Sequence, residues 1–234
     1  MAGRPRSRPP GSKRVLLLLV GAGVVGLVWY FFPPFRIVSL DEARAKRAQA
    51  TFQPREFAET FWANDLQDAL DDATAADELL ALIRSDPRAA KEAHGRTAEL
   101  GNVYYYFVRG AGLVTKVGDE EVSVALANDD GHSGADVVLV TANVFGNAIR
   151  NATGLLDVNQ FGNSQDFNNL SHELNTIAEY RVLSPFQKTV TARAAVEFVG
   201  CAEIEDEDRD LDPLRIIPVH LEIRETLESG AGKR

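Results

Sequence analysis

Apolar side chains recur at the three-to-four-residue spacing of amphipathic helices over residues 52–95. The first helix of this section carries its apolar stripe at Phe57, Phe61, Trp62, Leu66 and Leu70. A second helix, with Leu79, Leu80, Leu82 and Ile83, is expected to begin at an N-cap of Thr74. A third is expected to begin at Pro87, capped by Asp86, and to stop at Gly95.

The pattern then changes to the alternation and β-branched content that are typical of strands. Five strands are predicted, at residues 103–116, 121–127, 135–141, 189–204 and 214–223. Gly110 and Gly112 are expected to bend the first strand or to make it bulge. Between the third and fourth strands, residues 166–182 predict a helix with Phe167, Leu170, Leu174 and Ile177 on one stripe.

This order of elements predicts an α+β fold: a helical section followed by a five-stranded, OB-like antiparallel barrel with a helix between strands 3 and 4. A general α+β domain with an open antiparallel sheet is the alternative. Either fold leaves the ligand undetermined, because function depends on the site and not on the fold.

The N-terminus has the pattern of a membrane anchor. Residues 1–14 form a basic tail with five arginines and lysines, and residues 15–32 form an uncharged apolar run of transmembrane length. Trp29 and Tyr30 suit the interface at its far end, and basic residues on one flank predict a cytoplasmic N-terminus with an exported C-terminal domain. A cleaved signal peptide is the alternative, although bulky residues stand where a small-residue cleavage site is needed. The expected organisation is a tail at 1–14, a transmembrane signal anchor at 15–32, a linker at 33–51, the helical section at 52–95, a β-barrel-like domain at 101–225 and a flexible tail at 226–234.

Charge and cysteine content limit the possible functions. The net charge of the chain is −9, and leaving out the five basic residues of the tail makes it −14, a balance that argues against nucleic-acid binding. Cys201 is the only cysteine, and the four histidines are scattered without metal-site spacing. No nucleophile motif or phosphate-binding glycine loop is present. We therefore expect no enzyme activity, no catalytic residue, no cofactor and no metal.

A segment rich in asparagine, residues 143–175, is the candidate for ligand binding. Amide side chains both donate and accept hydrogen bonds, and together with an arginine they suit neutral hydroxylated ligands such as sugars. The candidate residues are Asn147, Arg150, Asn151, Asn159, Asn163, Asn175 and, as an apolar platform, Phe161. Alternatively, these amides cap and bridge the backbone of a long loop, and Arg150 pairs with a carboxylate. If the residues bind ligand, Arg150→Ala and Asn163→Ala should leave the thermal midpoint nearly unchanged.

The same segment carries a family resemblance. Ten of its residues match a family signature that begins Gly-small-Ala and ends Leu-Asn. They are Gly146, Ala148, Ile149, Arg150, Asn159, Phe161, Asn163, Phe167, Leu174 and Asn175. The likeness extends back to Trp62 and forward to Gly200 and the strand at 215–223. On these residues the chain resembles domain-of-unknown-function family 2291, the predicted periplasmic lipoproteins.

Two features depart from that family. A lipobox cysteine is missing before the domain, so a transmembrane anchor is expected to replace the lipid. Asn151 stands where aspartate is usual, and Ser164 where glutamine is usual.

The resemblance implies a link to sugar ABC transporters. The sequence thus predicts a non-enzymatic, single-pass inner-membrane accessory protein with a periplasmic domain, whose partner is an envelope protein or such a transporter. Two alternatives stay open: a domain that binds a carbohydrate or another small polar ligand, and an unrecognised hydrolase. A concave, amide-lined pocket at Arg150 would favour the ligand-binding domain, and a broad apolar patch would favour the accessory protein.

Overall fold

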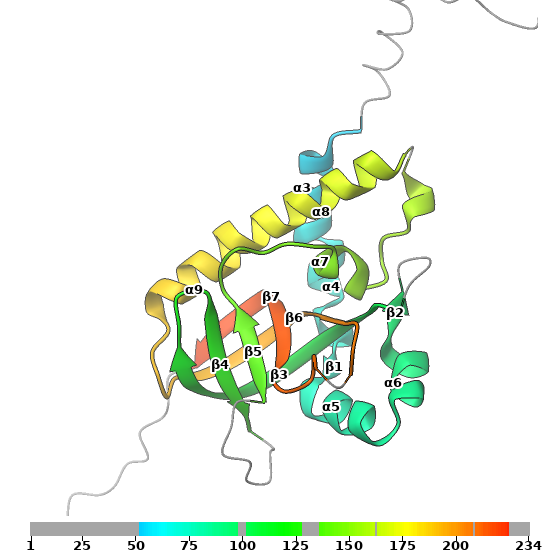
Figure 1. The fold of residues 1–234 in the computed structure, drawn as a ribbon. Helices are drawn as coiled ribbons and strands as arrows, with labels where there is room; N and C mark the ends of the chain where they lie inside the picture. Colours follow the sequence, from blue (N-terminus) through cyan, green and yellow to red (C-terminus); the bar gives the residue numbers. More distant parts are fainter. Residues whose placement is uncertain (1–51, 98–101, 128–135, 162, 208, 225–234) are drawn as a thin grey trace, which may run out of the picture. The chain divides into compact units, whose positions relative to one another are not determined.

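The structure is a computed structural model that describes residues 52–97, 102–127, 136–161, 163–207 and 209–224 (Figure 1). The described residues belong to one compact unit that begins at Phe52. The predicted basic tail, membrane anchor and linker lie outside the described residues, as does the predicted tail at 226–234. Within the described ranges, no helix has the length and apolar character to cross a membrane.

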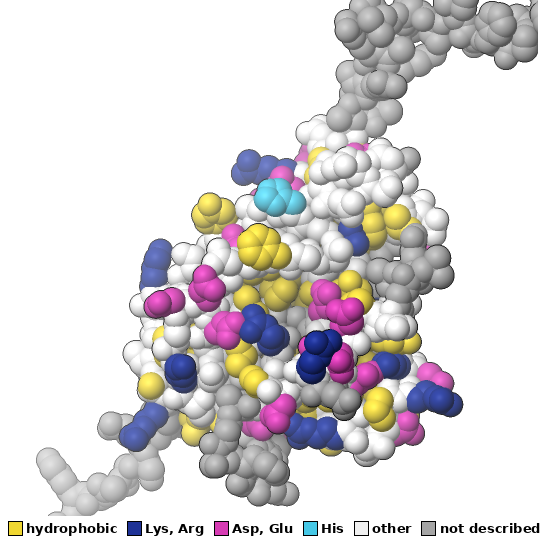
Figure 2. All heavy atoms as spheres, in the orientation of Figure 1, with side chains coloured by type: hydrophobic (Ala, Val, Ile, Leu, Met, Phe, Trp, Pro, Cys, Tyr) yellow, Lys and Arg dark blue, Asp and Glu magenta, His cyan; other side chains and the backbone are white. Residues whose placement is uncertain are grey.

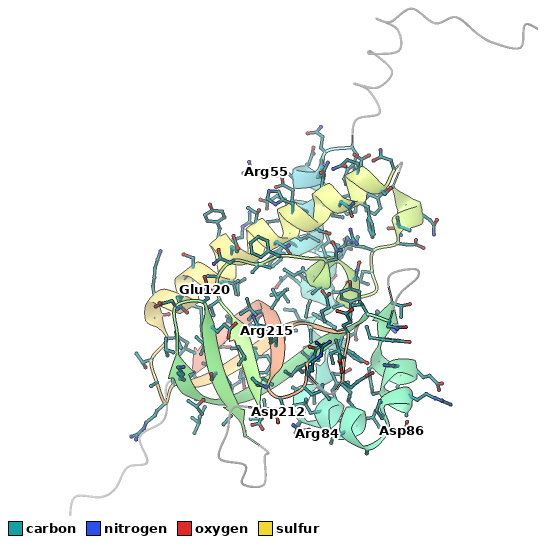
Figure 3. All side chains as sticks on the ribbon, viewed as in Figure 1. Arg55, Arg84, Asp86, Glu120, Asp212 and Arg215 are labelled. Carbon is teal, nitrogen blue, oxygen red and sulfur yellow. The ribbon has the colours of Figure 1, made fainter. Side chains whose placement is uncertain are left out.

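The helical section at the start of the unit is confirmed. Its elements are α3 (Pro54–Ala63), α4 (Asp65–Asp68), the 3-10 turn η1 (Leu70–Asp72), α5 (Ala76–Ser85) and α6 (Pro87–His94). Asp86, labelled in Figure 3, caps α6 as predicted, because its carboxylate accepts a 3.1 Å hydrogen bond from the backbone N–H of Ala89.

The predicted N-cap of α5 is wrong. Ala75 occupies that position, and Thr74 lies one residue earlier, in the short strand β1 (Thr74–Ala75). β1 runs parallel to β3 (Tyr104–Val117), and the Thr74 hydroxyl lies 3.1 Å from Nδ1 of His94. The Thr74 hydroxyl therefore contacts His94 of α6, and does not cap α5 as the local sequence predicted.

The five predicted strands are present. They are β3, β4 (Glu121–Leu126), β5 (Val137–Val140), β6 (Ala195–Ile204) and β7 (Leu214–Arg224). β4 pairs with β3 and β5, β7 with β5 and β6, and β6 returns to pair with β3 along ten residues of each strand. The hydrogen-bonded pairings therefore form an unbroken ring, in which β5 and β7 alone are parallel. β1 and a second short strand, β2 (Arg96–Thr97), pair with β3 and were not predicted.

The glycines of β3 do not make its bulge. The register shift between β3 and β4 lies between Val114 and Lys116. At Gly112 the backbones approach so closely that a Cβ atom would stand 2.1 Å from the carbonyl oxygen of Ala125. Gly110 likewise leaves room for the ring of Phe198. The two glycines serve close packing, since β3 has to pair on both of its edges.

The helix between the third and fourth strands of the ring is longer than predicted. α8 (Ser164–Ala178) continues through a π-helical turn (Glu179–Leu183) into α9 (Ser184–Thr189). The following strand therefore begins at Ala195, and not at residue 189 as predicted. In Figure 1, α8 crosses over the strands and lies beside α3, with which it packs.

Alternation along β3 divides the core into two clusters. Tyr106 and Val108 face the cluster enclosed by the strands, together with Phe198. Tyr105 and Phe107 face the second cluster, whose members come from α3, α7 (Ala148–Ala152), α8 and β6. On the face seen in Figure 2, acidic and basic side chains are interspersed over the strands. Arg215 of β7, labelled in Figure 3, belongs to this charged surface and pairs with Glu121 of β4 at 2.5 Å.

Candidate functional site

Arg150 lies on α7, a five-residue helix whose residues are all buried. Its side chain is only 4% exposed, which is rare for an arginine. α7 contacts β3, β6 and α8, so it fills the space between the strands and the long helix. The sequence predicted a loop residue at this position, and the structure shows a charged residue inside the second core cluster.

Neutral groups surround the Arg150 guanidinium. Nε donates to Oδ1 of Asn151 at 2.9 Å, and Nη1 donates to the carbonyl of Phe167 at 3.0 Å. Nη1 also reaches Oδ1 of Asn168 at 3.2 Å, and Cζ lies 3.7 Å from the centroid of the Phe167 ring. These contacts hold the guanidinium plane in one orientation, as a recognition site for a planar group requires.

No carboxylate pairs with Arg150 among the described residues, so the predicted ion pair is not found there. Burial lowers the pKa of the guanidinium, and the nearby Tyr105 opposes this effect. Burial raises the pKa of Tyr105, and Glu203 raises it further, whereas the Asn151 amide and Arg150 lower it. An arginine remains charged under these conditions, so α7 contributes a buried cation that has no ionic partner in the described part of the chain.

A concavity of about 470 Å³ opens beside this cation. Its charged lining residues are Arg96, Arg150 and Asp157. Its remaining lining residues are Thr97, Asn151, Gly154, Leu156, Val158, Ser164, Phe167 and Asn168. Three strands, β3, β4 and β5, separate Arg96 from Arg150 in the sequence. The Arg96 Nε nevertheless lies 2.7 Å from where a Cβ atom on Gly154 would stand. Gly154 has no Cβ atom and a positive φ of +70°, so the Arg96 side chain can lie directly against its backbone.

Asn151 lines the same concavity. Its amide nitrogen is buried and faces Tyr105, whose pKa is raised by burial and lowered in part by a hydrogen bond with Asn151, although the geometry of that bond is poor. Its oxygen is already used by Arg150 Nε. A buried cation without an ionic partner among the described residues is unfavourable in the absence of a ligand, so Arg150 points to an acceptor that these residues do not supply.

The other predicted site residues do not line this concavity. Asn163 caps α8, with Oδ1 accepting from the backbone N–H of Asp166 at 2.9 Å. Asn159 is bound to Asp157, Asn175 donates to the carbonyl of Gly146, and Asn147 precedes α7 at its N-cap position. For Asn159, Asn163 and Asn175 these placements match the alternative of capping and bridging amides, whereas the side chain of Asn147 makes no capping hydrogen bond.

Phe161 belongs to an aromatic cluster. Its ring centroid lies 5.2 Å from that of Phe52, 5.5 Å from that of Phe57 and 5.0 Å from that of Phe167. Because Phe167 also underlies Arg150, Phe161 supports the site from behind and does not line the concavity.

Sequence reasoning missed Arg96 and Thr97. They belong to β2, a two-residue strand that pairs with Tyr105 and Tyr104 of β3. No pattern marks so short a strand, and its place beside α7 follows from tertiary structure alone. Asn168 was counted in the asparagine-rich segment but was not a candidate, and the structure places it on Arg150.

A second concavity, of about 370 Å³, is acidic. Glu203, Glu205 and Asp210 line it together with Arg215 and the exposed Phe145. Burial raises the pKa of Glu203, and Glu205 and Asp210 raise it further. In the described ranges, no group of three His, Cys, Asp or Glu side chains has an arrangement that could hold a metal ion.

The strand order and the interposed helix define an OB-like α+β domain. A crystal structure of an OB-fold protein from Thermotoga maritima is similar to this chain, with a TM-score of 0.65 and 27% identity. The similarity covers 74% of this chain and 99% of that one. No curated protein matches the chain.

The family model that describes predicted periplasmic lipoproteins (DUF2291) matches residues 24–222. The chain therefore belongs to the DUF2291 family, and the resemblance found in the sequence is confirmed. The family's description assigns its members to the periplasm.

Proposed function

We propose that this protein is a periplasmic binding module that holds a small polar ligand, such as a carbohydrate derivative, in the concavity beside Arg150. The observation that carries the proposal is the oriented Arg150 guanidinium, which is 4% exposed and has no ionic partner among the described residues. A volume of about 470 Å³ is within the range of small-molecule sites.

The lining chemistry favours binding over catalysis. The described lining residues include one carboxylate, that of Asp157, and no histidine or cysteine. Oδ1 of Asp157 already accepts from the backbone and the side chain of Asn159. An acid–base reaction needs a free, positioned proton acceptor, whereas arginine and amide donors suffice to bind and orient a ligand.

We further propose that residues 15–32 anchor the domain to the inner membrane, with the N-terminus in the cytoplasm. Cys201, the only cysteine of the sequence, is fully buried in β6. A lipid cannot be attached to this thiol in the folded protein, so the apolar run is the better candidate for the attachment that the family description implies. A reporter enzyme that is active only outside the cytoplasm, fused to the C-terminus, tests this topology: we expect activity, and an inactive fusion contradicts it.

The binding proposal is tested with the full chain in a non-ionic detergent. A thermal-shift screen of sugars, sugar acids and sugar phosphates is expected to find ligands, whose affinity is then measured by calorimetry. Arg96 is exposed, so Arg96→Ala should keep the fold and weaken binding. Arg88→Ala, which removes an exposed arginine from α6 outside this concavity, is the matched control. No ligand in the screen, or equal binding by both variants, would contradict the proposal.

A second function, as an accessory protein of a membrane partner, is favoured by two exposed aromatic residues. Phe145 is 78% exposed and Tyr180 is 75% exposed. A 2.7 Å hydrogen bond from the backbone N–H of Val144 to the Glu179 carboxylate joins their segments. Exposed aromatic residues are typical of protein contacts, and the family resemblance suggests a sugar ABC transporter as the partner. Crosslinking in membranes should capture the transporter with the intact chain and lose it with Phe145→Ser plus Tyr180→Ser, while the Arg88→Ala variant retains it.

A further inference from the structure

Resting on the binding proposed above, we infer that the ligand carries an oxyanion group, a carboxylate or a phosphate, which binds between Arg150 and Arg96. The ligand would then be an anionic derivative of a sugar, and not the neutral sugar that the asparagine-rich sequence suggested.

The first support is the charge of the concavity. Its lining contains two arginines and one aspartate, although the chain as a whole is acidic. No carboxylate pairs with either arginine among the described residues. A desolvated cation without a partner is costly, and a bound anion would offset that cost at Arg150.

The second support is the set of unused donors. Nε and Nη1 of Arg150 have acceptors, but Nη2 has none among the described residues. The buried Asn151 amide nitrogen is held only by a poorly aligned hydrogen bond with Tyr105. Arg96 adds further N–H groups above Gly154. A guanidinium fork complements the oxygens of a carboxylate or a phosphate, whereas a neutral hydroxyl needs acceptors as well as donors.

The third support is the placement of α8. This helix has 15 residues and begins at Ser164, which lines the concavity. The N-terminal end of a helix carries a partial positive charge and free backbone N–H groups. Its N-cap, Asn163, uses its oxygen on Asp166, so the earlier N–H groups are not capped by this side chain. The helix therefore adds to the positive potential of the two arginines, and the Asp166 carboxylate in its first turn offsets part of this contribution.

Three ligands with the same ring test the inference: glucose, glucuronate and glucose 6-phosphate, each titrated calorimetrically into the full chain in non-ionic detergent at constant ionic strength. We expect at least one of the two anions to bind about tenfold or more tightly than glucose, the scale of one charge-assisted contact. Its affinity should also fall as salt is raised. Equal binding of glucose and the anions would overturn the inference and leave the proposed function standing. Binding by none of the three would count against both.

Asn151→Asp tests where the anion binds without creating a cavity in the core. The substitution keeps the shape of the side chain and puts a carboxylate on the Nε of Arg150, where Asn151 Oδ1 now accepts. We expect the folded variant to bind the anion at least about tenfold more weakly, because the new carboxylate competes for the same cation. Asn169→Asp, which makes the same charge change on an exposed residue outside the concavity, should bind like the parent. Unchanged affinity in Asn151→Asp, or equal losses in both variants, would overturn the inference.

Discussion

The guanidinium of Arg150 lies over the aromatic ring of Phe167, with 3.7 Å between Cζ and the ring centroid. The same phenylalanine accepts a hydrogen bond from Arg150 through its backbone carbonyl. A single residue of α8 thus contacts the cation through both its aromatic ring and its backbone carbonyl. This double contact explains how a charge can be held in the core without a carboxylate, since cation–π attraction strengthens where water is excluded.

Arg150→Ala is expected to destabilise the domain by roughly 2–4 kcal/mol, because it leaves three acceptors without their donor and opens a cavity beside Phe167. This prediction differs from the one made from the sequence, in which a ligand-binding Arg150 could be replaced with the thermal midpoint nearly unchanged. Urea unfolding followed by circular dichroism measures the change. Arg88→Ala, on an exposed part of α6, should stay within about 0.5 kcal/mol of the parent. A similarly small change for Arg150→Ala would show that the observed contacts contribute little.

Asn163→Ala should cost about 1 kcal/mol, which is the usual contribution of an N-cap. The structure gives Asn163 this role, since its oxygen accepts from the N–H of Asp166 and its nitrogen donates to the Asp166 carboxylate. For a domain of this size the midpoint should fall by about 2–4 °C. Asn163→Ser keeps an acceptor at the cap and should recover most of the loss. If both variants melt like the parent, the cap does not stabilise α8.

Gly112→Ala is expected to be strongly destabilising, by roughly 2–3 kcal/mol or more. A Cβ atom there would stand 2.1 Å from the carbonyl oxygen of Ala125 and 2.7 Å from Cγ1 of Val124, so β3 and β4 would have to separate. Ala111→Ser changes the neighbouring, exposed position and should have a small effect. Thermal unfolding of both variants measures the difference, and equal midpoints would contradict the close approach seen at Gly112.

The Cys201 thiol is expected to resist modification in the folded protein. It is fully buried, and burial raises its pKa, so the reactive thiolate is scarce. A chromogenic disulfide reagent should label it only after urea is added, at the rate of unfolding. Rapid labelling without denaturant would contradict this burial and would also reopen the question of a thiol-based anchor.

Glu203→Gln should stabilise the domain at neutral pH. Because burial, Glu205 and Asp210 raise the pKa of Glu203 in the folded state, that state binds a proton more readily than the unfolded chain. The carboxyl therefore favours folding when protonated, and this contribution is lost as pH rises through its folded pKa. We expect Glu203→Gln to raise the midpoint slightly, by about 1–2 °C, at pH 7 and to change little at pH 4. A gain at pH 4 that equals the gain at pH 7 would contradict this linkage.

More of the fold than of the site could be predicted from the sequence. The five strands alternate or are rich in β-branched residues, and the stripe from Phe167 to Ile177 marks the intervening helix, so local patterns determine the element order. The limits of the elements were less predictable. α8 runs on through a π-helical turn into α9, and Pro185 lies near the N-terminus of α9, where a proline is tolerated.

The site depends on contacts between distant segments. Arg150 stood out in the sequence as the one cation among amides, and the structure places it in the lining of the concavity. Arg96 could not be found, because it reaches Gly154 only after β2 pairs with β3. The role of Asn163 in capping α8 is local, and it was the stated alternative to ligand binding.

The most direct test of the oxyanion site follows the guanidinium itself. In ¹⁵N-labelled full chain, held in non-ionic detergent, glucuronate or glucose 6-phosphate is added while the Arg150 Nε–H signal and the backbone amides are recorded. We expect the largest shifts at Arg150 Nε–H, Asn151 and Gly154, with saturation at the affinity measured by calorimetry. Saturating shifts centred on Glu203 and Phe145, or an Arg150 signal that does not move, would contradict the account.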